Sequence, residues 1–261
     1  MLVDSHCHLN YKGLREDQPG VIARARVAGV GTMLGISTRQ SEWDEVIALA
    51  DAETDIWATV GIHPHEADAH PDIDAQRLID AAAHARVIGI GETGLDYFYD
   101  HSDRDRQRAS FRSHIHAARA TGLPLIVHTR DAEDDTLEIL RDEMGQGRFG
   151  GVIHCFTASQ AFAEEALALG FYISLSGIVT FKNARDLQAS AALVPGDRLL
   201  VETDAPFLAP VPMRGKTCEP AFVAHTAAFV AGLRGEGADA LAASTTDNFF
   251  ALFGKATRPC A

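Results

Sequence analysis

The sequence is poor in cysteine and proline and contains no long apolar run, and each shortage argues against a class of protein. Only four cysteines occur among 261 residues, far apart and without a CxxC pair, so neither a disulfide scaffold nor a cysteine-rich zinc site is expected. Ten prolines and the lack of low-complexity segments argue against collagen-like and disordered chains. No apolar run approaches the roughly 20 residues of a membrane helix, and the opening MLVDSHCHLN lacks the features of a secretion signal. We therefore expect a cytoplasmic protein without membrane contact.

Basic residues are also in deficit. The chain carries 36 acidic and 23 basic side chains, a formal net charge of −13, which disfavours non-specific adhesion to nucleic acid or anionic membranes. A nucleic-acid substrate held by bound metal and a few basic residues stays compatible with this charge. The hydrophobic fraction of 46% and the chain length suffice for a large core, in two small domains or in one α/β barrel of roughly 250 residues.

Short apolar runs recur at intervals of roughly 28 residues, the size of one βα unit. Most are rich in Val, Ile or Leu without polar alternation, a pattern typical of parallel strands that are buried on both faces. The runs are Leu2–Asp4, Gly31–Ile36, Ile56–Gly61, Val87–Gly91, Pro124–Val127, Gly151–Ile153, Phe171–Leu175 and Leu199–Val201.

Helix-like stretches separate these runs and complete the fold prediction. Ser41 opens a Ser-x-x-Asp capping pattern, and Gly122 and Gly170 stand in helix C-cap positions. The pattern predicts an α/β fold, a (β/α)8 TIM-type barrel with extra C-terminal helices, in one domain spanning residues 1–261. A doubly wound open sheet is the rival, but eight similar units without a Gly-rich dinucleotide fingerprint favour the barrel. The predicted helices are Ser41–Ala52, Asp103–Thr121, Asp131–Met144, Ser159–Leu169, 219–233 and 238–253.

Histidines and carboxylates gather at the ends of the predicted strands, where the active sites of such barrels lie. His6 and His8 are two residues apart, so alternation directs both into the barrel mouth. Taken alone they could be surface histidines in a turn, but other candidate ligands follow later strands. Imidazole and carboxylate donors suit divalent ions, and six donors are too many for one catalytic site that keeps a position for water. Two ions that share one carboxylate fit better. The six candidate ligands are His6, His8, Glu92, His128, His154 and Asp204.

The cysteines and the remaining histidines have no predicted place in this centre. Cys7 follows His6 and Cys155 follows His154, so strand alternation predicts that both thiols point outward into the helix layer. His114 and His116 lie two apart on a helix and therefore on different faces, which predicts solvated or capping roles. The chain contains neither a G-x-S-x-G elbow nor a P-loop.

The motifs at these strand ends resemble those of the TatD-family metal-dependent deoxyribonucleases, which belong to the amidohydrolase-like barrels. The resemblance spans essentially the whole chain. In order, the motifs are DSHCHLN, VGIHPHEA, IGETGLDYFYD, LIVHTRDA, GVIHCFTAS, SLSGIVTFKNA, LLVETDAPFLAPVPMRGK and NFFALFG.

The resemblance implies a division of the ligands between two ions (Mg²⁺, Mn²⁺ or Zn²⁺). One ion would take His6, His8, Glu92 and Asp204, and the other would take Glu92, His128 and His154, with Glu92 as the bridge. The expected activity is a deoxyribonuclease, in particular a 3′-end exonuclease on single-stranded or damaged DNA, with RNA open as a substrate.

The expected mechanism is in-line attack on phosphorus by a hydroxide that two metal ions activate. Asp204 is expected to orient the hydroxide and take its proton, and His63 to hydrogen-bond a phosphate oxygen or protonate the leaving group. The cations best placed to bind flanking phosphates are Arg130, Lys182 and Arg214.

Two other classes of function stay open at this point. The same metals could hydrolyse a carboxylic ester or amide, as in a lactonase or a deacylase of aminoacyl-nucleic acids. A non-catalytic binding scaffold would predict lost ligands, whereas all six candidates are present. The physiological metal and the choice between exo- and endonuclease action are open, and a monomer is expected.

Overall fold

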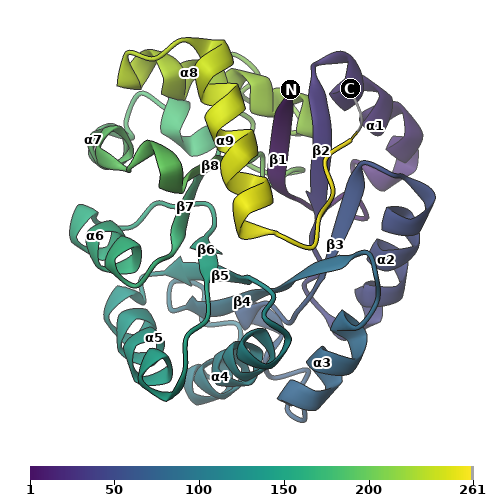
Figure 1. The fold of residues 1–261 in the computed structure, drawn as a ribbon, viewed down its shortest axis with the longest axis vertical. Coiled ribbons are helices and arrows are strands. Elements are labelled where there is room, and N and C mark those ends of the chain that lie inside the picture. Colours follow the sequence, from purple (N-terminus) through teal and green to yellow (C-terminus); the bar gives the residue numbers. More distant parts are fainter. Residues whose placement is uncertain (260–261) are drawn as a thin grey trace.

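Parallel strands form the centre of the molecule, and the computed structural model describes residues 1–259 (Figure 1). Eight strands are present in this range, and each pairs in parallel with the next along the chain. A bridge between Cys7 and Ala205 joins the first strand to the segment that follows the last one. Chain order and spatial order therefore coincide, which confirms the predicted (β/α)8 barrel and excludes the doubly wound sheet. The strands are β1 (Leu2–Cys7), β2 (Val30–Gly35), β3 (Ile56–Val60), β4 (Val87–Asp96), β5 (Leu125–Arg130), β6 (Gly151–Ile153), β7 (Tyr172–Leu175) and β8 (Leu199–Val201).

Helices that connect the strands cover the outside of the barrel (Figure 1). Within residues 1–259, none of them combines the length and the apolarity that crossing a bilayer requires. The helices are α1 (Gln18–Val27), α2 (Trp43–Ala52), α3 (Ala75–Ala82), α4 (Arg104–Thr121), α5 (Glu133–Gln146), α6 (Gln160–Ala168), α7 (Arg185–Leu193), α8 (Val223–Arg234) and α9 (Ala238–Leu252).

Local capping explains where some of these helices begin and end. The Asp103 carboxylate accepts backbone hydrogen bonds at the first turn of α4, and Gly122 ends that helix in the left-handed conformation (φ 69°). The cap predicted at Ser41 is wrong. Ser41 lies within a short 3-10 turn, Gln40–Glu42, and α2 begins only at Trp43, with no side-chain cap.

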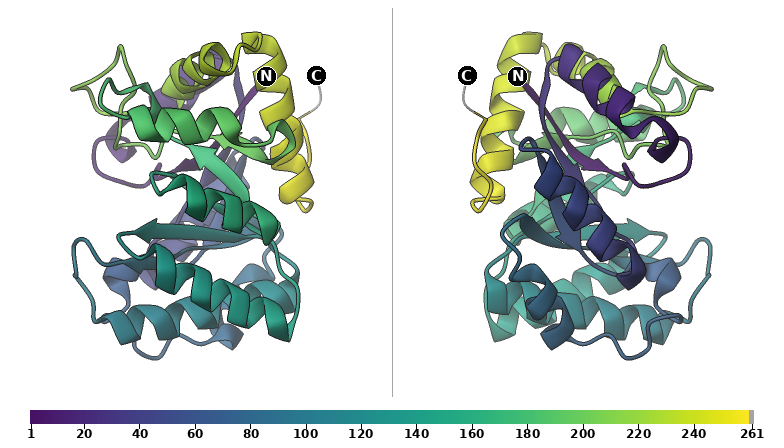
Figure 2. Two further views of the ribbon diagram at one scale, coloured as in Figure 1. Left: turned by 90° about the vertical axis from the view of Figure 1, so that its left-hand side faces the viewer. Right: turned by 90° about the vertical axis from the view of Figure 1, so that its right-hand side faces the viewer.

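Helix α9 closes the end of the barrel where the strands begin (Figure 2). Its Phe249 and the following Phe253 pack against Val3, Leu34 and Ile126 inside the barrel. Burial of these rings stabilises the fold by about 2 kcal/mol each. Because this end is closed, the opposite end, where the strands finish, is the one that can hold a site.

Strand β4 is longer than predicted. The apolar run ends at Gly91, but the strand continues to Asp96, paired with Arg130 at the end of β5. All ten residues of β4 are buried. The extension carries Glu92 into the barrel mouth and places Asp96 beside the residues that follow β5.

Candidate metal centre

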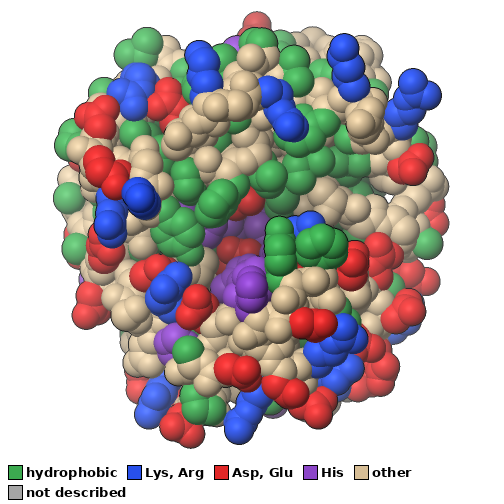
Figure 3. Space-filling model, turned by 180° about the vertical axis from the view of Figure 1, so that it is seen from behind, with side chains coloured by type: hydrophobic (Ala, Val, Ile, Leu, Met, Phe, Trp, Pro, Cys, Tyr) green, Lys and Arg blue, Asp and Glu red, His purple; other side chains and the backbone are tan. Residues whose placement is uncertain are grey.

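The C-terminal ends of the strands surround a cavity of about 720 Å³ at the open end of the barrel. The view from this side shows histidine and acidic side chains at the base of a hollow, with hydrophobic side chains along parts of its rim (Figure 3). All six predicted ligands converge at this base or its wall. They come from β1, β4 and β5 and from the segments that follow β1, β6 and β8.

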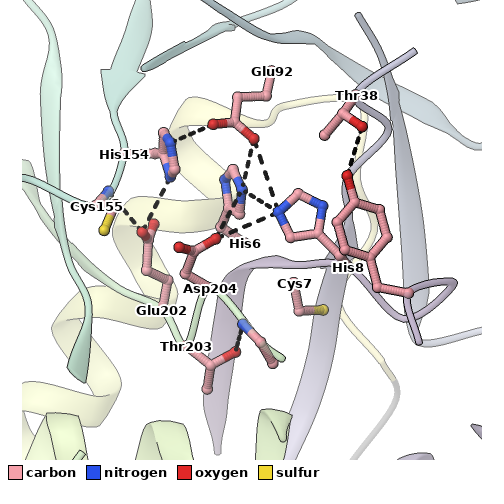
Figure 4. A network of polar contacts seen from close by, with 12 residues as sticks. His6, Cys7, His8, Thr38, Glu92, His154, Cys155, Glu202, Thr203 and Asp204 are labelled. Atoms are coloured by element: carbon pink, nitrogen blue, oxygen red, sulfur yellow. Dashed lines mark hydrogen bonds and ion pairs between the residues drawn. The ribbon is translucent and has the colours of Figure 1, made fainter. Parts of the chain in front are cut away.

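One group of donors lies on the β1 and β8 side of the cavity (Figure 4). The Nε2 atom of His6 lies 3.3 Å from Glu92 Oε2 and 3.6 Å from Asp204 Oδ1. The Nε2 atom of His8 lies 3.4 Å from Asp204 Oδ1 and 3.3 Å from His6 Nε2. Two imidazole nitrogens and two carboxylate oxygens therefore face one point. Such a set needs a proton or a metal cation between the donors, because facing lone pairs repel one another.

A second group surrounds the other oxygen of Glu92. Glu92 Oε1 lies 2.7 Å from His154 Nε2, 3.2 Å from His128 Nδ1 and 3.4 Å from His63 Nε2. The Glu92 carboxylate thus directs one oxygen toward each group of donors. This is the arrangement that a carboxylate shared between two cations requires.

Two further carboxylates, which the sequence analysis did not select, orient the histidines of the second group. Asp96 Oδ2 lies 3.2 Å from His128 Nε2, and Glu202 Oε1 lies 3.3 Å from His154 Nδ1. Each carboxylate accepts a hydrogen bond from the far ring nitrogen, which orients the ring so that its other nitrogen faces Glu92 and the position of a cation. This carboxylate–histidine pairing is characteristic of histidines that bind metals.

His63 has a different arrangement of its ring nitrogens. Its Nδ1 accepts a hydrogen bond from the backbone N–H of His65 at 3.1 Å, and burial holds the pKa of His63 well below its usual range. The neutral ring therefore carries its proton on Nε2, the nitrogen that faces Glu92. In this tautomer His63 is a hydrogen-bond donor toward the centre.

The electrostatics of the centre keep its carboxylates ionised. Burial by itself would raise the pKa of Glu92, but the electrostatic attraction of the surrounding histidines, with His154 the strongest, outweighs it and holds that pKa well below its usual range. Burial would also raise the pKa of Asp204. The hydrogen bond from His8 and the charge of His6 outweigh burial and lower that pKa. Anionic carboxylates among imidazoles fit divalent cations. Among residues 1–259, three groups have ligand atoms within 4.8 Å of one another, namely His6–His8–Glu92, His63–Glu92–His128 and His6–His154–Glu202.

The predicted phosphate-binding cations divide into two classes. Arg130 lines the cavity, whereas Lys182 and Arg214 are not among its lining residues. Arg214 is exposed and lies over the ring of Phe181, 3.8 Å from the ring centroid. Sequence reasoning missed Arg39, which also lines the cavity.

The orientation predicted for Cys155 is wrong. Cys7 is fully buried in the layer between barrel and helices, as expected, but Cys155 lines the cavity. Strand β6 ends at Ile153, and Cys155 adopts a left-handed backbone (φ 44°), so strand alternation no longer applies there. Its backbone N–H donates to Glu202 Oε1 at 2.6 Å.

The role predicted for His114 is also wrong. His114 is fully buried within α4 rather than solvated. Its Nε2 accepts a hydrogen bond from the backbone N–H of Ile62, the residue before His63, at 2.9 Å. His116, two residues along the same helix, is exposed as expected and lies 3.1 Å from Glu143.

Comparison with known proteins places this geometry in a family. Residues 3–254 match the family model described as TatD related DNase. A protein of Escherichia coli (strain K12), described as the uncharacterized metal-dependent hydrolase YcfH, is 46% identical over 256 residues, covering 97% of this chain and 95% of that protein. The 3′-5′ ssDNA/RNA exonuclease TatD of Klebsiella pneumoniae (strain 342) is 33% identical over 258 residues and covers 97% and 98%.

A solved structure agrees with both sequence comparisons. The crystal structure of YJJV, a TatD homolog from Escherichia coli K12, superposes with a TM-score of 0.91 at 31% identity and covers 97% of this chain and 98% of that chain. The chain therefore belongs to the TatD family of metal-dependent hydrolases.

Proposed function

We propose that this protein hydrolyses phosphodiester bonds at the ends of single-stranded nucleic acid, with two divalent ions (Mg²⁺, Mn²⁺ or Zn²⁺) as cofactors. The observation that carries the proposal is the position of Glu92, whose two oxygens face two separate groups of donors. Glu92 would bridge the ions. The remaining ligands would be His6, His8 and Asp204 for one ion, and His128 and His154 for the other.

Bound in this way, two divalent ions would supply Lewis acidity that activates a water molecule and neutralises charge that develops at phosphorus. The side chain of Asp204 is 15% exposed, compared with 3% for Glu92, so water reaches Asp204 more readily. Its lowered pKa keeps it ionised. Asp204 therefore orients the attacking water and accepts its proton.

His63 contributes from the opposite side of Glu92. Its Nε2–H group donates a hydrogen bond to a phosphate oxygen, where negative charge grows in the transition state. Because burial lowers the pKa of His63 and keeps the ring neutral, it acts as a neutral donor rather than as a charged acid.

The choice of substrate rests on charge. A protein with a net charge of −13 cannot hold long duplexes through a general basic surface. Arg130 in the cavity wall and the metal ions would supply the contacts to phosphate, with Lys182 and Arg214 further out on the rim. The name of the Klebsiella relative, a 3′-5′ ssDNA/RNA exonuclease, supports action on single strands.

The test compares substrates with one metal-loaded preparation. An end-labelled single strand should shorten progressively from its 3′ end, while a duplex and a simple carboxylic ester should react far more slowly. Asp204→Asn, prepared in parallel, should be inactive and so exclude a contaminating nuclease. Faster hydrolysis of the ester than of the strand would contradict the proposal and favour an ester or amide hydrolase.

A further inference from the structure

Exposed aromatic side chains stand on two opposite sides of the cavity mouth. Phe98 and Tyr99, in the loop after β4, are 54% and 49% exposed, and Phe207, in the loop after β8, is 51% exposed. Tyr99 and Phe207 both line the cavity that contains the candidate metal centre. Since β4 and β8 lie on opposite sides of an eight-stranded barrel in chain order, the two aromatic groups face the centre from two directions. Exposed aromatic rings that gather around one cavity, rather than being scattered singly over the surface, are typical of a binding site.

The loop after β4 is held in place by a residue that also holds the centre. Asp96 Oδ1 accepts hydrogen bonds from the backbone N–H groups of Phe98 and Tyr99, each at 3.0 Å. The other oxygen, Oδ2, lies 2.8 Å from His65 Nε2 and 3.2 Å from His128 Nε2. One buried carboxylate thus fixes the aromatic loop relative to a candidate metal ligand. The two rings are therefore a preorganised surface.

Arg130 lies against the aromatic rings on this side of the cavity mouth. Its guanidinium carbon lies 3.9 Å from the ring centroid of Phe98 and 4.7 Å from that of Tyr99. Arg108 and Arg112, nearby on α4, each pair with carboxylates. No such ion pair is formed by Arg130 with any residue between 1 and 259. A guanidinium on aromatic rings without an anionic partner suits a phosphate that is flanked by a base.

Phe207 is coupled to the other group of candidate ligands. Its ring meets Tyr11 edge to face, with centroids 6.2 Å apart, and Tyr11 stacks on His8 at 4.6 Å. The Tyr11 hydroxyl bonds to Thr38 Oγ1 at 2.6 Å, which holds the stack in position. The Phe207 ring also meets the His8 ring edge to face, with centroids 6.4 Å apart, so it directly borders a candidate metal ligand.

We propose that the cavity mouth has two stacking sites for unpaired nucleobases, one on either side of the scissile phosphate. Tyr99 and Phe98 form one site, and Phe207 forms the other. This inference rests on the proposed phosphodiester hydrolysis and defines how its substrate is selected. Bases in a duplex are already stacked on one another, whereas unpaired bases offer free faces, so the two sites select single strands. Aromatic stacking accepts every base, because each base has a π-face. The enzyme therefore acts on single strands with little sequence preference.

The experiment measures the affinity of the metal-loaded protein for two short strands by fluorescence anisotropy. One is a thymidine strand, and the other is a strand of the same length and charge that lacks bases. Both carry phosphorothioate linkages, which resist hydrolysis during the measurement. Loss of one stacking contact weakens binding by about five- to a hundred-fold. We expect this loss for the thymidine strand with Tyr99→Ala and with Phe207→Ala, and a much smaller change for the abasic strand.

Two further variants control for indirect effects. Tyr99→Phe keeps the ring and should retain most of the affinity for the thymidine strand. Leu193→Ala removes another exposed apolar side chain, 63% exposed at the end of α7 and outside the cavity lining, and should bind like the parent. If the parent binds both strands equally, or if Tyr99→Ala and Phe207→Ala weaken both strands equally, the stacking sites do not exist.

The same preparations separate this inference from the proposed reaction. Ordinary phosphodiester strands with and without bases are cleaved in parallel. A parent that cleaves both strands with equal rates and equal affinities supports the reaction and overturns the stacking sites. A parent that prefers the thymidine strand through Tyr99 and Phe207 but cleaves neither strand supports the stacking sites and overturns the reaction.

Discussion

His114 should make the stability of the fold depend on pH in a defined direction. It is fully buried in α4, where its Nδ1 hydrogen-bonds to the Ser110 carbonyl oxygen at 2.7 Å and its Nε2 accepts from Ile62 N–H at 2.9 Å. Because Nε2 must accept, the native ring is neutral and carries its proton on Nδ1. Burial lowers the pKa of His114 to about 4, and the hydrogen bond to Ser110 opposes this shift only in part.

The sign and the size of the effect follow from linkage. In the unfolded chain His114 has a pKa near 6.5, so as the pH falls below that value the unfolded chain binds a proton that the native chain excludes. The free energy of unfolding therefore decreases as the pH falls from about 6.5 to about 4. Below about pH 4 this group causes no further change. A shift of this size, at about 1.4 kcal/mol per pH unit, amounts to about 3 kcal/mol.

The assay is urea unfolding of metal-depleted protein at a series of pH values, compared with His114→Gln. Glutamine retains an acceptor and a donor but does not titrate in this range. Other titrating groups contribute equally to both proteins and cancel in the difference between their unfolding free energies. That difference should change by about 3 kcal/mol from neutral to acidic pH. His116→Gln, on the exposed face of the same helix, should keep the pH dependence of the parent. A parent-minus-His114→Gln difference that is flat with pH would refute the reasoning.

Further predictions concern the centre and its surroundings. Glu92→Gln should abolish turnover and lower the metal content of a still folded protein, measured by elemental analysis; a tenth of the parent rate at saturating metal would exclude the bridging role. Glu202→Gln should weaken metal affinity or activity by about 10- to 100-fold, because His154 loses its orienting carboxylate; unchanged metal titrations would contradict this. Cys7→Ala should cost about 1 kcal/mol in unfolding free energy through lost packing, with metal content unchanged. Arg130→Gln should reduce the salt slope of single-strand binding by about 0.7, and an equal slope would remove Arg130 from the phosphate contacts.

Most of the barrel could be predicted because its strands are buried on both faces. Runs of Val, Ile and Leu mark such strands without help from tertiary contacts, and Gly151–Ile153 and Leu199–Val201 were predicted with the observed bounds. The end of β4 could not be predicted in this way. Its last residues, from Glu92 to Asp96, include polar side chains that remain buried only because β5 and the candidate metal centre supply partners.

The convergence of the six candidate ligands was predictable from topology, since the ends of parallel strands share one rim. Their partners were harder to find. Asp96 lies beyond the predicted end of β4. Glu202 lies between the end of β8 and Asp204, whose left-handed backbone (φ 56°) interrupts the strand alternation. The direction of the Glu202 side chain could therefore not be predicted.

The misassignment of His114 was avoidable from the sequence. It lies three residues after Phe111 and four before Ala118, next to Ile115, and all four are buried. That spacing is the buried stripe of an amphipathic helix. Comparing His114 only with His116 showed that the two occupy different faces of α4 but left open which face is buried.

The seam between β1 and β8 connects the closure of the barrel to the assembly of the centre. Among residues 1–259, the other neighbouring strands pair over two or more residues, whereas the end of β1 meets the segment after β8 through an isolated bridge between Cys7 and Ala205. Backbone bonds run there from His8 N–H to the Ala205 carbonyl oxygen at 2.8 Å and from Asp204 N–H to the His6 carbonyl oxygen at 2.9 Å. Side-chain hydrogen bonds supplement these contacts. The Asp4 carboxylate accepts hydrogen bonds from the hydroxyl and the backbone N–H of Thr203, at 2.5 and 2.9 Å. His6 and His8 lie on one side of this seam and Asp204 on the other, so a cation bound among them would join the two strands directly. A metal bound there would therefore reinforce the one junction between neighbouring strands of residues 1–259 that lacks a continuous ladder, and metal binding would be energetically coupled to completion of the fold.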